Sequence, residues 1–267
     1  MYDQYDTFIS QLMEEFKQYA GKVEEENGIA ITIEMYNASD SQTTQNSQVE
    51  KMINDGCDVI CVNLVDRTEP TTVIDLAEKS NVPVIFFNRE LVEEDLERWE
   101  QLYYVGAKAF ESGILEGQIA AETWKRNALL DKNQDGVLQY LVLEGEAGHQ
   151  DTIVRTEYAV NTIMENGIEV EKIGYAIANW NRAQAQTKMA QMLTEYGTDV
   201  GLEAVRSGEM SGTVYNDKEG QARAMLDLAY HLSTDGDLTG LNLENKKYIR
   251  LPYSKVLPED VQTFLNK

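Results

Sequence analysis

The sequence contains few cysteines, few histidines and a small share of basic residues. Its 267 residues include two cysteines, two histidines and 23 lysines and arginines against 46 acidic residues, so the formal net charge is −23. A surface this acidic repels phosphate backbones, which argues against nucleic-acid binding. On one strand, Cys57 and Cys61 would lie about 13 Å apart, which is too far for a disulfide. We expect two buried free thiols.

Long apolar runs are also absent from the sequence. None approaches the roughly 18 residues of a membrane span, and no segment has the pattern of a signal peptide. A mature secreted protein and a cytosolic protein would both have these features. The chain is 42% hydrophobic and 26% charged, which is typical of a soluble globular protein with a hydrophobic core.

Helical and strand periodicities alternate along the chain, which predicts an α/β fold with parallel sheets flanked by helices. An apolar stripe from Phe8 to Val23 predicts a first helix, which ends at Asn27-Gly28. The alternation of strands and helices begins again after YYVG, near residue 106, and this second series predicts a second lobe. Further strands are expected at 29–36, 59–65, 83–88, 138–145 and 170–178, and further helices around Val49–Ile53 and at 70–80, 107–126, 151–166 and 181–195.

The alternation is interrupted in two places. The chain opens on a helix with no strand before it, and TEYGTDV leads from one helix directly into another, GLEAVRSG. A strand, or a strand–helix–strand unit of roughly 30 residues, is missing at the second place. We therefore expect segments to be missing before Met1 and between Gly197 and Thr198.

The run DKNQDGVLQ is the clearest candidate for a metal site. Oxygen-bearing side chains alternate around a glycine at Asp131, Asn133, Asp135 and Gln139, which is the pattern of a calcium loop, with the backbone carbonyl of Val137 as a further ligand. The twelfth position of such a loop is normally a glutamate, and here it is Val142. The alternative is a polar turn, because Asp, Asn and Gly all favour turns.

A second candidate site lies in GEAGHQDTIVR, where a predicted strand gives way to a helix. His149, Asp151 and Arg155 gather there, and Asp151 and Arg155 share a helix face as an i, i+4 pair. A planar guanidinium beside a carboxylate can bind vicinal hydroxyls, as in a sugar. The alternative is an aspartate that caps the helix and forms a surface ion pair.

Other candidate residues follow predicted strands. Ligands of parallel sheets bind at the carboxyl ends of the strands, where this sequence places Asn88, Trp180 and Asn216 as well as His149 and Asp151. Aromatic rings can stack on the C–H faces of a pyranose while carboxylates and amides bind its hydroxyls. Trp180 lies among polar residues, which favours a site, whereas Phe8 lies on an apolar stripe, which favours core packing.

The chain resembles the periplasmic glucose/galactose-binding proteins, the type I sugar-binding components of ABC importers. The resemblance covers nearly the whole chain. It rests on a set of segments that occur in the family's order and spacing: YDQYDTF, INDGCDVICVNLVD, VPVIFFNRE, YYVGAKAFESGILEGQIA, DKNQDGVLQ, LEGEAGHQDTIVR, ANWNRAQAQTKM, SGEMSGTVYND and IRLPYSKV.

This resemblance implies roles for individual residues. It implies that the sugar hydroxyls are bound by Asp6, Asn88, Asp151, Arg155, Asp199 and Asn216, with His149 as a further polar contact. Phe8 and Trp180 would sandwich the sugar ring. Structural Ca²⁺ would be bound by Asp131, Asn133, Asp135, Val137 and Gln139. The expected missing segment after Gly197 would supply another sugar-binding asparagine and the glutamate that completes the calcium site.

The resemblance also implies the domain organisation. It predicts a two-lobed type I fold, with residues 1–106 and 218–251 in the N-terminal lobe and residues 107–217 and 252–267 in the C-terminal lobe. Three crossing strands would form a hinge near Gly106, Asp217 and Leu251. We expect the lobes to act as a clamp that closes on D-glucose or D-galactose.

The function implied is extracytoplasmic delivery of a monosaccharide to a membrane ABC permease, with a chemoreceptor as a further partner in some family members. The protein would be periplasmic, or a lipoprotein anchored at the cell surface, and not an enzyme. Alternatives are a sugar sensor without a transport role and a sugar-active enzyme that uses paired carboxylates. A repressor effector domain would require a helix-turn-helix and a basic patch, neither of which the sequence offers.

Overall fold

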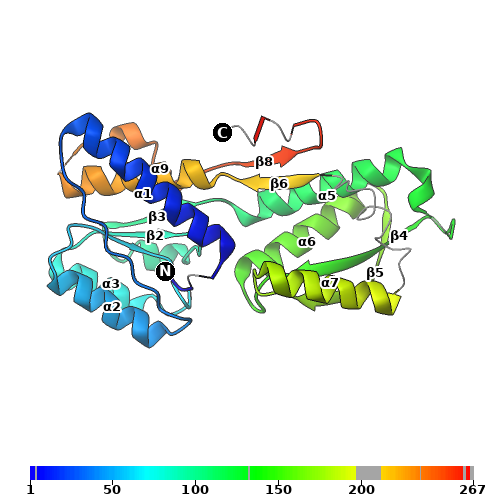
Figure 1. Ribbon diagram of the computed structural model, residues 1–267, viewed down its shortest axis with the longest axis horizontal. Helices are drawn as coiled ribbons and strands as arrows, with labels where there is room; N and C mark the ends of the chain where they lie inside the picture. Colours follow the sequence, from blue (N-terminus) through cyan, green and yellow to red (C-terminus); the bar gives the residue numbers. More distant parts are fainter. Residues whose placement is uncertain (4, 132, 197–211, 235, 261–262, 265–267) are drawn as a thin grey trace. The chain divides into compact units, whose positions relative to one another are not determined.

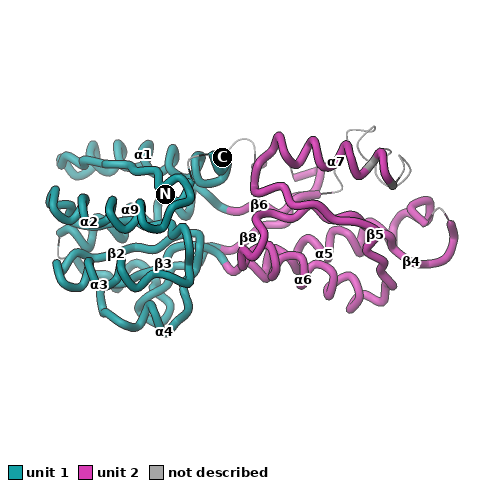
Figure 2. The backbone as a smooth tube through the Cα atoms, turned by 90° about the horizontal axis from the view of Figure 1, so that it is seen from below, with its two compact units in different colours: residues 1–107, 217–251 teal, residues 108–216, 252–267 magenta. Residues whose placement is uncertain are grey.

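The chain folds as two units, each built from segments that are far apart in the sequence (Figure 2). The computed structural model describes residues 1–267 except 4, 132, 197–211, 235, 261–262 and 265–267 (Figure 1). Residues 1–107 and 217–251 form unit 1, and residues 108–216 and 252–267 form unit 2. The chain thus passes between the units three times, after Ala107, Asn216 and Leu251.

Unit 1 is built around a parallel sheet with the strand order β1-β2-β3-β7. Its first helix, α1 (Thr7–Asn27), is capped at its start by Asp6, whose side chain accepts a hydrogen bond from the Ile9 amide, and at its end by Gly28, which has a left-handed backbone (φ 65°). The described elements of the unit are α1 (Thr7–Asn27), α2 (Gln42–Asn54), β1 (Ile60–Val62), α3 (Thr71–Ser80), β2 (Val84–Phe87), α4 (Glu93–Leu96), β3 (Leu102–Gly106), α9 (Lys218–Ser233), η3 (Thr239–Leu241) and β7 (Tyr248–Arg250).

The sheet of unit 1 is buried on both faces, and its side chains sort by a period of two. Ile85 and Phe87 of β2 pack into a cluster with apolar residues of α1 and α9. Val84 and Phe86 of the same strand pack into a second cluster with residues of α2 and α3. Figure 1 shows α1 and α9 on one side of β2 and β3, and α2 and α3 on the other. The continuous apolar run VIFF is therefore required by burial on both sides.

Unit 2 contains a parallel pair, β4–β5, and an antiparallel pair, β6–β8. In Figure 2, α7 lies on one side of β4 and β5, and α5 and α6 lie on the other. Gly113 and Gly117 let α5 approach α6, because a Cβ at either position would meet the backbone of α6. The described elements are α5 (Ala109–Arg126), η1 (Ala128–Leu130), β4 (Val137–Glu144), α6 (Gln150–Glu165), β5 (Glu169–Ile177), α7 (Arg182–Tyr196), β6 (Thr213–Asn216) and β8 (Tyr253–Val256).

Two expectations from the sequence need correction. The predicted strand at 29–36 is not formed, because a strand requires a hydrogen-bonded neighbour and β1 pairs with β2 alone among the described strands. Cys57 and Cys61 are free thiols, as expected, but both are half-buried rather than buried.

Among the described helices, none combines the length and the apolar character that crossing a bilayer requires.

Candidate functional site

The residues predicted at the start of α6 form a connected polar cluster in unit 2. His149 is the residue that caps the helix, and its Nδ1 accepts a hydrogen bond of 3.0 Å from the Asp151 amide. The alternative in which Asp151 caps the helix is therefore wrong. The Asp151 side chain lies in the first turn instead, where the positive end of the helix dipole favours a carboxylate. It accepts a hydrogen bond of 3.1 Å from Arg155 Nη2.

This ion pair differs from an ordinary surface pair in its burial. The side chains of Arg155 and Asp151 are 26% and 17% exposed. Arg155 Nη2 also donates a hydrogen bond of 2.6 Å to the hydroxyl of Tyr253. Burial opposes the charge of Arg155, but the facing oxygens of Tyr253 and Asp151 raise its pKa above the ordinary value. Among the described residues, the buried Nε of Arg155 has no hydrogen-bond partner, so it remains able to donate to a ligand.

Trp180 brings an aromatic face to the same cluster. It follows β5 in a left-handed conformation with φ 55°, which turns the chain sharply after the strand. A Cβ on Gly145, at the end of β4, would overlap the Trp180 ring, so this glycine makes room for the indole. The ring meets His149 edge to face, with centroids 5.4 Å apart, and lies 5.9 Å from the guanidinium of Arg155.

Tyr253 is the member of the cluster that the sequence did not reveal. It lies on β8, directly opposite Asn216 of β6 in the antiparallel register. Burial raises the pKa of Tyr253 to about 12, so the phenol stays protonated and keeps a hydroxyl to donate. The pairing of β6 with β8 therefore places Asn216, a predicted sugar-binding residue, beside Tyr253, which is the hydrogen-bond partner of Arg155. The only sequence signal was a tyrosine next to the predicted third crossing.

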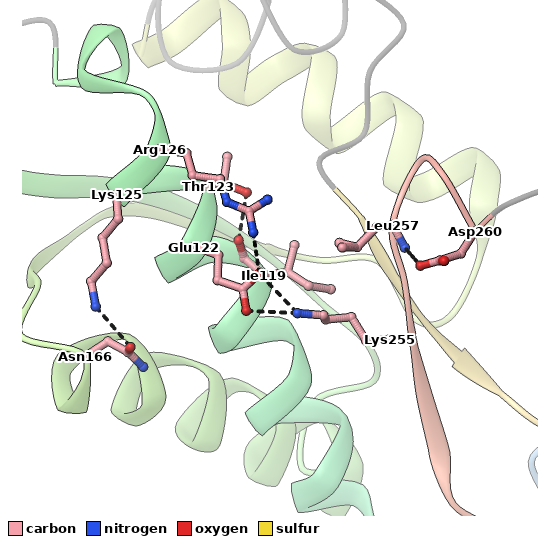
Figure 3. A network of polar contacts seen from close by, with 9 residues as sticks. All are labelled: Ile119, Glu122, Thr123, Lys125, Arg126, Asn166, Lys255, Leu257 and Asp260. Atoms are coloured by element: carbon pink, nitrogen blue, oxygen red, sulfur yellow. Dashed lines mark hydrogen bonds and ion pairs between the residues drawn. The ribbon is translucent and has the colours of Figure 1, made fainter.

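A separate ion pair holds β8 against α5 (Figure 3). Lys255, two residues after Tyr253 and on the same side of the strand, donates to both carboxylate oxygens of Glu122 at 2.9 and 3.1 Å. Arg126, one turn further along α5, lies 3.5 Å from the same carboxylate. These bonds tie the strand that carries Tyr253 to a helix that packs on α6.

In unit 1, Asp6 and Phe8 lie at the start of α1. Both carboxylate oxygens of Asp6 accept hydrogen bonds, one from the Ile9 amide at 2.9 Å and one from the Tyr2 hydroxyl at 2.6 Å. Phe8 is half-buried and packs against the core cluster of the unit, as the packing alternative expects. Its contact with a sugar stays a prediction.

Asn88 ends β2 in a left-handed conformation with φ 63°. Its side-chain oxygen accepts a hydrogen bond of 3.0 Å from the side-chain nitrogen of Asn63, which orients the Asn88 side chain. The next residue, Arg89, lies with its guanidinium 3.8 Å from the centre of the Tyr2 ring. Tyr2 and Arg89 therefore connect Asn88 to Asp6, a link across the fold that the sequence did not reveal. Asp199, the remaining predicted sugar-binding residue, lies outside the described residues.

The predicted calcium loop is a tight polar turn before β4. Asp131 accepts a hydrogen bond from the Gly136 amide at 3.0 Å, and Asp135 accepts from the side chain of Asn133 at 2.7 Å and the amide of Val137 at 2.8 Å. Within the described part of the chain, no three His, Cys, Asp or Glu side chains are grouped as a metal site would require.

Two features of the loop nevertheless suit a hard cation. The second oxygen of Asp131 is buried and has no hydrogen-bond partner in the part of the chain that the structure describes, whereas a buried oxygen normally has one. Gln139 faces Glu171 across the β4–β5 ladder, with 2.7 Å between the amide nitrogen and the carboxylate. The oxygen-rich donor set thus fits calcium, and the ion itself stays a prediction.

Comparison with known proteins identifies the family. A family profile for the periplasmic binding protein domain matches residues 1–201. The D-galactose/methyl-galactoside binding periplasmic protein of Haemophilus influenzae is 30% identical over 298 residues, which cover 97% of this chain and 88% of that protein. This chain belongs to the periplasmic binding protein family. The resemblance seen in the sequence is thus confirmed.

Solved structures agree with this membership at the level of the fold. An ABC transporter solute-binding protein of Bacillus halodurans with bound myo-inositol superposes with a TM-score of 0.74 at 21% identity, over 98% of this chain and 94% of that one. A protein of Actinobacillus succinogenes with bound D-allose gives a TM-score of 0.72 at 19% identity, over 94% and 95%. The predicted α/β fold of the type I class is confirmed.

Proposed function

We propose that this periplasmic binding protein binds a monosaccharide, D-galactose or D-glucose, outside the cytoplasm and presents it to a membrane ABC permease. The protein then acts as a carrier: it releases its sugar chemically unchanged and is not an enzyme. Similarity to the Haemophilus galactoside-binding protein supports the choice of sugar. A chemoreceptor is a second candidate partner for the loaded form.

The observation that carries this proposal is the cluster around Arg155 in unit 2. A half-buried guanidinium, held by Asp151 and Tyr253, presents planar donors, which suit adjacent hydroxyls of a sugar. The Trp180 face beside it offers an apolar surface for the C–H groups of a pyranose. In unit 1, the carboxylate of Asp6 can accept hydrogen bonds from sugar hydroxyls, and the side-chain amide of Asn88 can both donate and accept them.

The proposed mechanism uses both sets of residues. A sugar bound by Asp6, Phe8 and Asn88 of one unit and by the Arg155 cluster of the other stabilises the conformation in which both sets contact it. The sugar shifts that equilibrium only by its differential affinity for the two states. Galactose and glucose differ in the orientation of one hydroxyl, and we propose that Asp6 is the residue that discriminates between the two sugars.

Isothermal titration calorimetry with D-galactose and D-glucose tests the proposal. We expect saturable binding, a radius of gyration that falls on binding, and full recovery of unchanged sugar. Arg155→Lys keeps the charge but loses the fork of donors, and should weaken binding about 10-fold or more. Arg126→Lys, at a 72% exposed side chain, is the matched control. Absence of binding to every monosaccharide tested, or conversion of the sugar, would refute the carrier.

We further propose that the loop formed by Asp131, Asn133, Asp135, Val137 and Gln139 holds a structural Ca²⁺, with Glu171 as an additional carboxylate beside it. The ion would neutralise the loop carboxylates and rigidify the turn before β4. Calcium should raise Tm by a few degrees, EGTA should reverse this, and Asp135→Asn should abolish it. Equal Tm values with calcium and with EGTA would remove the metal from the proposal without affecting the sugar site.

A further inference from the structure

Two side-chain amides of unit 1 are buried in an otherwise apolar layer. Asn63, the residue after β1, is fully buried, and Gln45 of α2 is 3% exposed. They lie beside Val49, Val62 and Leu64 of the cluster that packs against α2 and α3. An amide buried in such surroundings lowers stability wherever its polar atoms lack partners. The hydrogen bonds of Asn63 and Gln45 therefore indicate why the two amides are there.

Gln45 holds the backbone that carries Asn63. The side-chain nitrogen of Gln45 donates a hydrogen bond of 2.8 Å to the Asn63 carbonyl, and its side-chain oxygen accepts one of 3.0 Å from the Val65 amide. One side chain of α2 thus fixes the chain directly after β1. The position from which the Asn63 side chain reaches toward β2 is fixed with it.

The side-chain nitrogen of Asn63 faces the end of β2. It donates hydrogen bonds of 3.0 Å to two acceptors, the Phe87 carbonyl and the side-chain oxygen of Asn88. A backbone carbonyl can only accept, so the group of Asn63 that faces Phe87 is its NH2 and not its oxygen. The same NH2 faces Asn88, which must therefore turn its oxygen toward Asn63. One backbone carbonyl thus determines the orientation of both side-chain amides.

The backbone of Asn88 is held as firmly as its side-chain oxygen. Its amide donates a hydrogen bond of 3.3 Å to the Val105 carbonyl, and its carbonyl accepts one of 2.9 Å from the Tyr104 hydroxyl. The left-handed φ of 63° is one that asparagine adopts more readily than most residues. Among the described residues, the side-chain nitrogen of Asn88 is then its only polar group without a partner.

This arrangement is unfavourable for stability, which indicates a role in binding. The side-chain oxygen of Asn63 is buried, and none of the described residues donates to it. A buried acceptor without a partner is destabilising. Leucine has a similar size and would suit the apolar cluster without this penalty. Unpaired polar groups and uncommon backbone conformations of this kind are concentrated at functional sites.

We propose that Asn63 is a positioning residue of the sugar site, which holds Asn88 with its side-chain nitrogen toward the ligand. This inference rests on the proposed function and deepens it, because it assigns the direction of one hydrogen bond. Asn88 donates to a sugar oxygen, whereas the carboxylate of Asp6 can only accept. Asn63 itself does not contact the sugar and acts through Asn88.

The first test compares variants by calorimetry with D-galactose and D-glucose. Asn63→Leu removes the donor at similar volume, and we expect affinity to fall about 10-fold. Asn88→Asp leaves the buried layer unaltered. Asn63 still donates to one carboxylate oxygen, so the other oxygen faces the ligand in place of the nitrogen, and affinity should fall about 100-fold or more.

The matched control is Gln101→Leu, which should leave affinity unchanged. Gln101 also forms a bond of 3.0 Å between side-chain amides in unit 1, in this case to Asn81. It precedes β3, whereas Asn88 follows the parallel strand β2, so the control lies at the opposite end of the sheet.

A double-variant cycle shows whether Asn63 acts through Asn88. Asn88→Gly removes the side chain and tolerates the left-handed backbone. In that background, Asn63→Leu should cause no further loss of affinity. A further 10-fold loss would overturn the proposal, and so would an Asn88→Asp variant that binds sugar as tightly as the parent protein.

A measurement without sugar separates this inference from the proposed function. Solvent exchange of the two side-chain NH2 groups can be followed by nitrogen-15 NMR. We expect the NH2 of Asn63 to exchange at least about 10-fold more slowly than that of Asn88. The reverse order contradicts the positioning role even if sugar binds. A parent protein that binds no monosaccharide but shows the expected order would contradict the proposed function alone.

Discussion

The two units are stabilised in different ways, although both are built from parallel strands and helices. In unit 1, the strands β2 and β3 are buried along their whole length, between two large apolar clusters. In unit 2, no residue of β4 or β5 is fully buried, and the described core cluster consists of Ala121, Ile163 and Ile168. Polar bonds between elements are the prominent contacts there, such as Arg155–Tyr253 and Lys255–Glu122.

This difference indicates a division of labour between stability and recognition. Apolar burial stabilises in proportion to area and without direction, so it holds unit 1 together but orients few groups. Charge-assisted hydrogen bonds are directional, and in unit 2 they orient Arg155 and the strand β8. We therefore expect core substitutions to cost most in unit 1 and polar substitutions to cost binding in unit 2.

The largest expected effect comes from a matched pair of leucines. Leu102→Ala empties a fully buried site on β3 and should cost about 3–5 kcal/mol. Leu141→Ala on β4, a half-buried site, should cost about 1 kcal/mol. Hydrogen exchange under mild denaturant measures each unit by itself, since a chain with two units need not unfold in one step. Equal costs would contradict the difference in burial.

A glycine in unit 2 should affect binding more than stability. Gly145→Ala places a Cβ where the Trp180 ring lies, so the ring must move away from Arg155. We expect sugar affinity to fall about 10- to 100-fold, that is about 1.4–2.7 kcal/mol. Gly21→Ala, on α1 of unit 1, meets no atom within 4 Å, and should be neutral or slightly stabilising. Calorimetry with unchanged affinity for Gly145→Ala would exclude Trp180 from the site.

The same contrast explains what could be predicted from the sequence. The helices and most strands were predicted to within a few residues, because apolar periodicity reports burial directly. The strand at 29–36 was wrong because periodicity does not report whether a pairing partner is present. Asp151 and Arg155 were predicted to meet because i, i+4 spacing fixes that contact. Tyr253 could not be predicted, since it reaches Arg155 from 98 residues away.

A single hydroxyl in unit 2 should matter to binding alone. Tyr253→Phe removes the partner that accepts from Arg155 at 2.6 Å, so the guanidinium loses one of its two anchors. Sugar affinity should fall about 5- to 10-fold, with a small change in Tm. Tyr175→Phe, at a side chain on β5 that is 61% exposed, is the control. A larger loss of stability than of affinity would make Tyr253 a packing residue and not one that positions Arg155.

The smallest effect is expected at the ion pair that holds β8. Lys255 and Glu122 are 27% and 40% exposed, and lysine lowers the pKa of the Glu122 carboxyl. A partly exposed pair of this kind contributes about 0.5 kcal/mol, so Lys255→Met should hardly change stability, and high salt should remove the difference. The same ion pair should have a small effect on sugar binding, because it aligns the strand β8. We expect Lys255→Met to weaken sugar binding about 2-fold at low salt. Tyr253 is on the same strand, so adding Lys255→Met to a Tyr253→Phe variant should cause no further loss of sugar affinity. Additive losses would mean that the ion pair acts on the site independently of Tyr253.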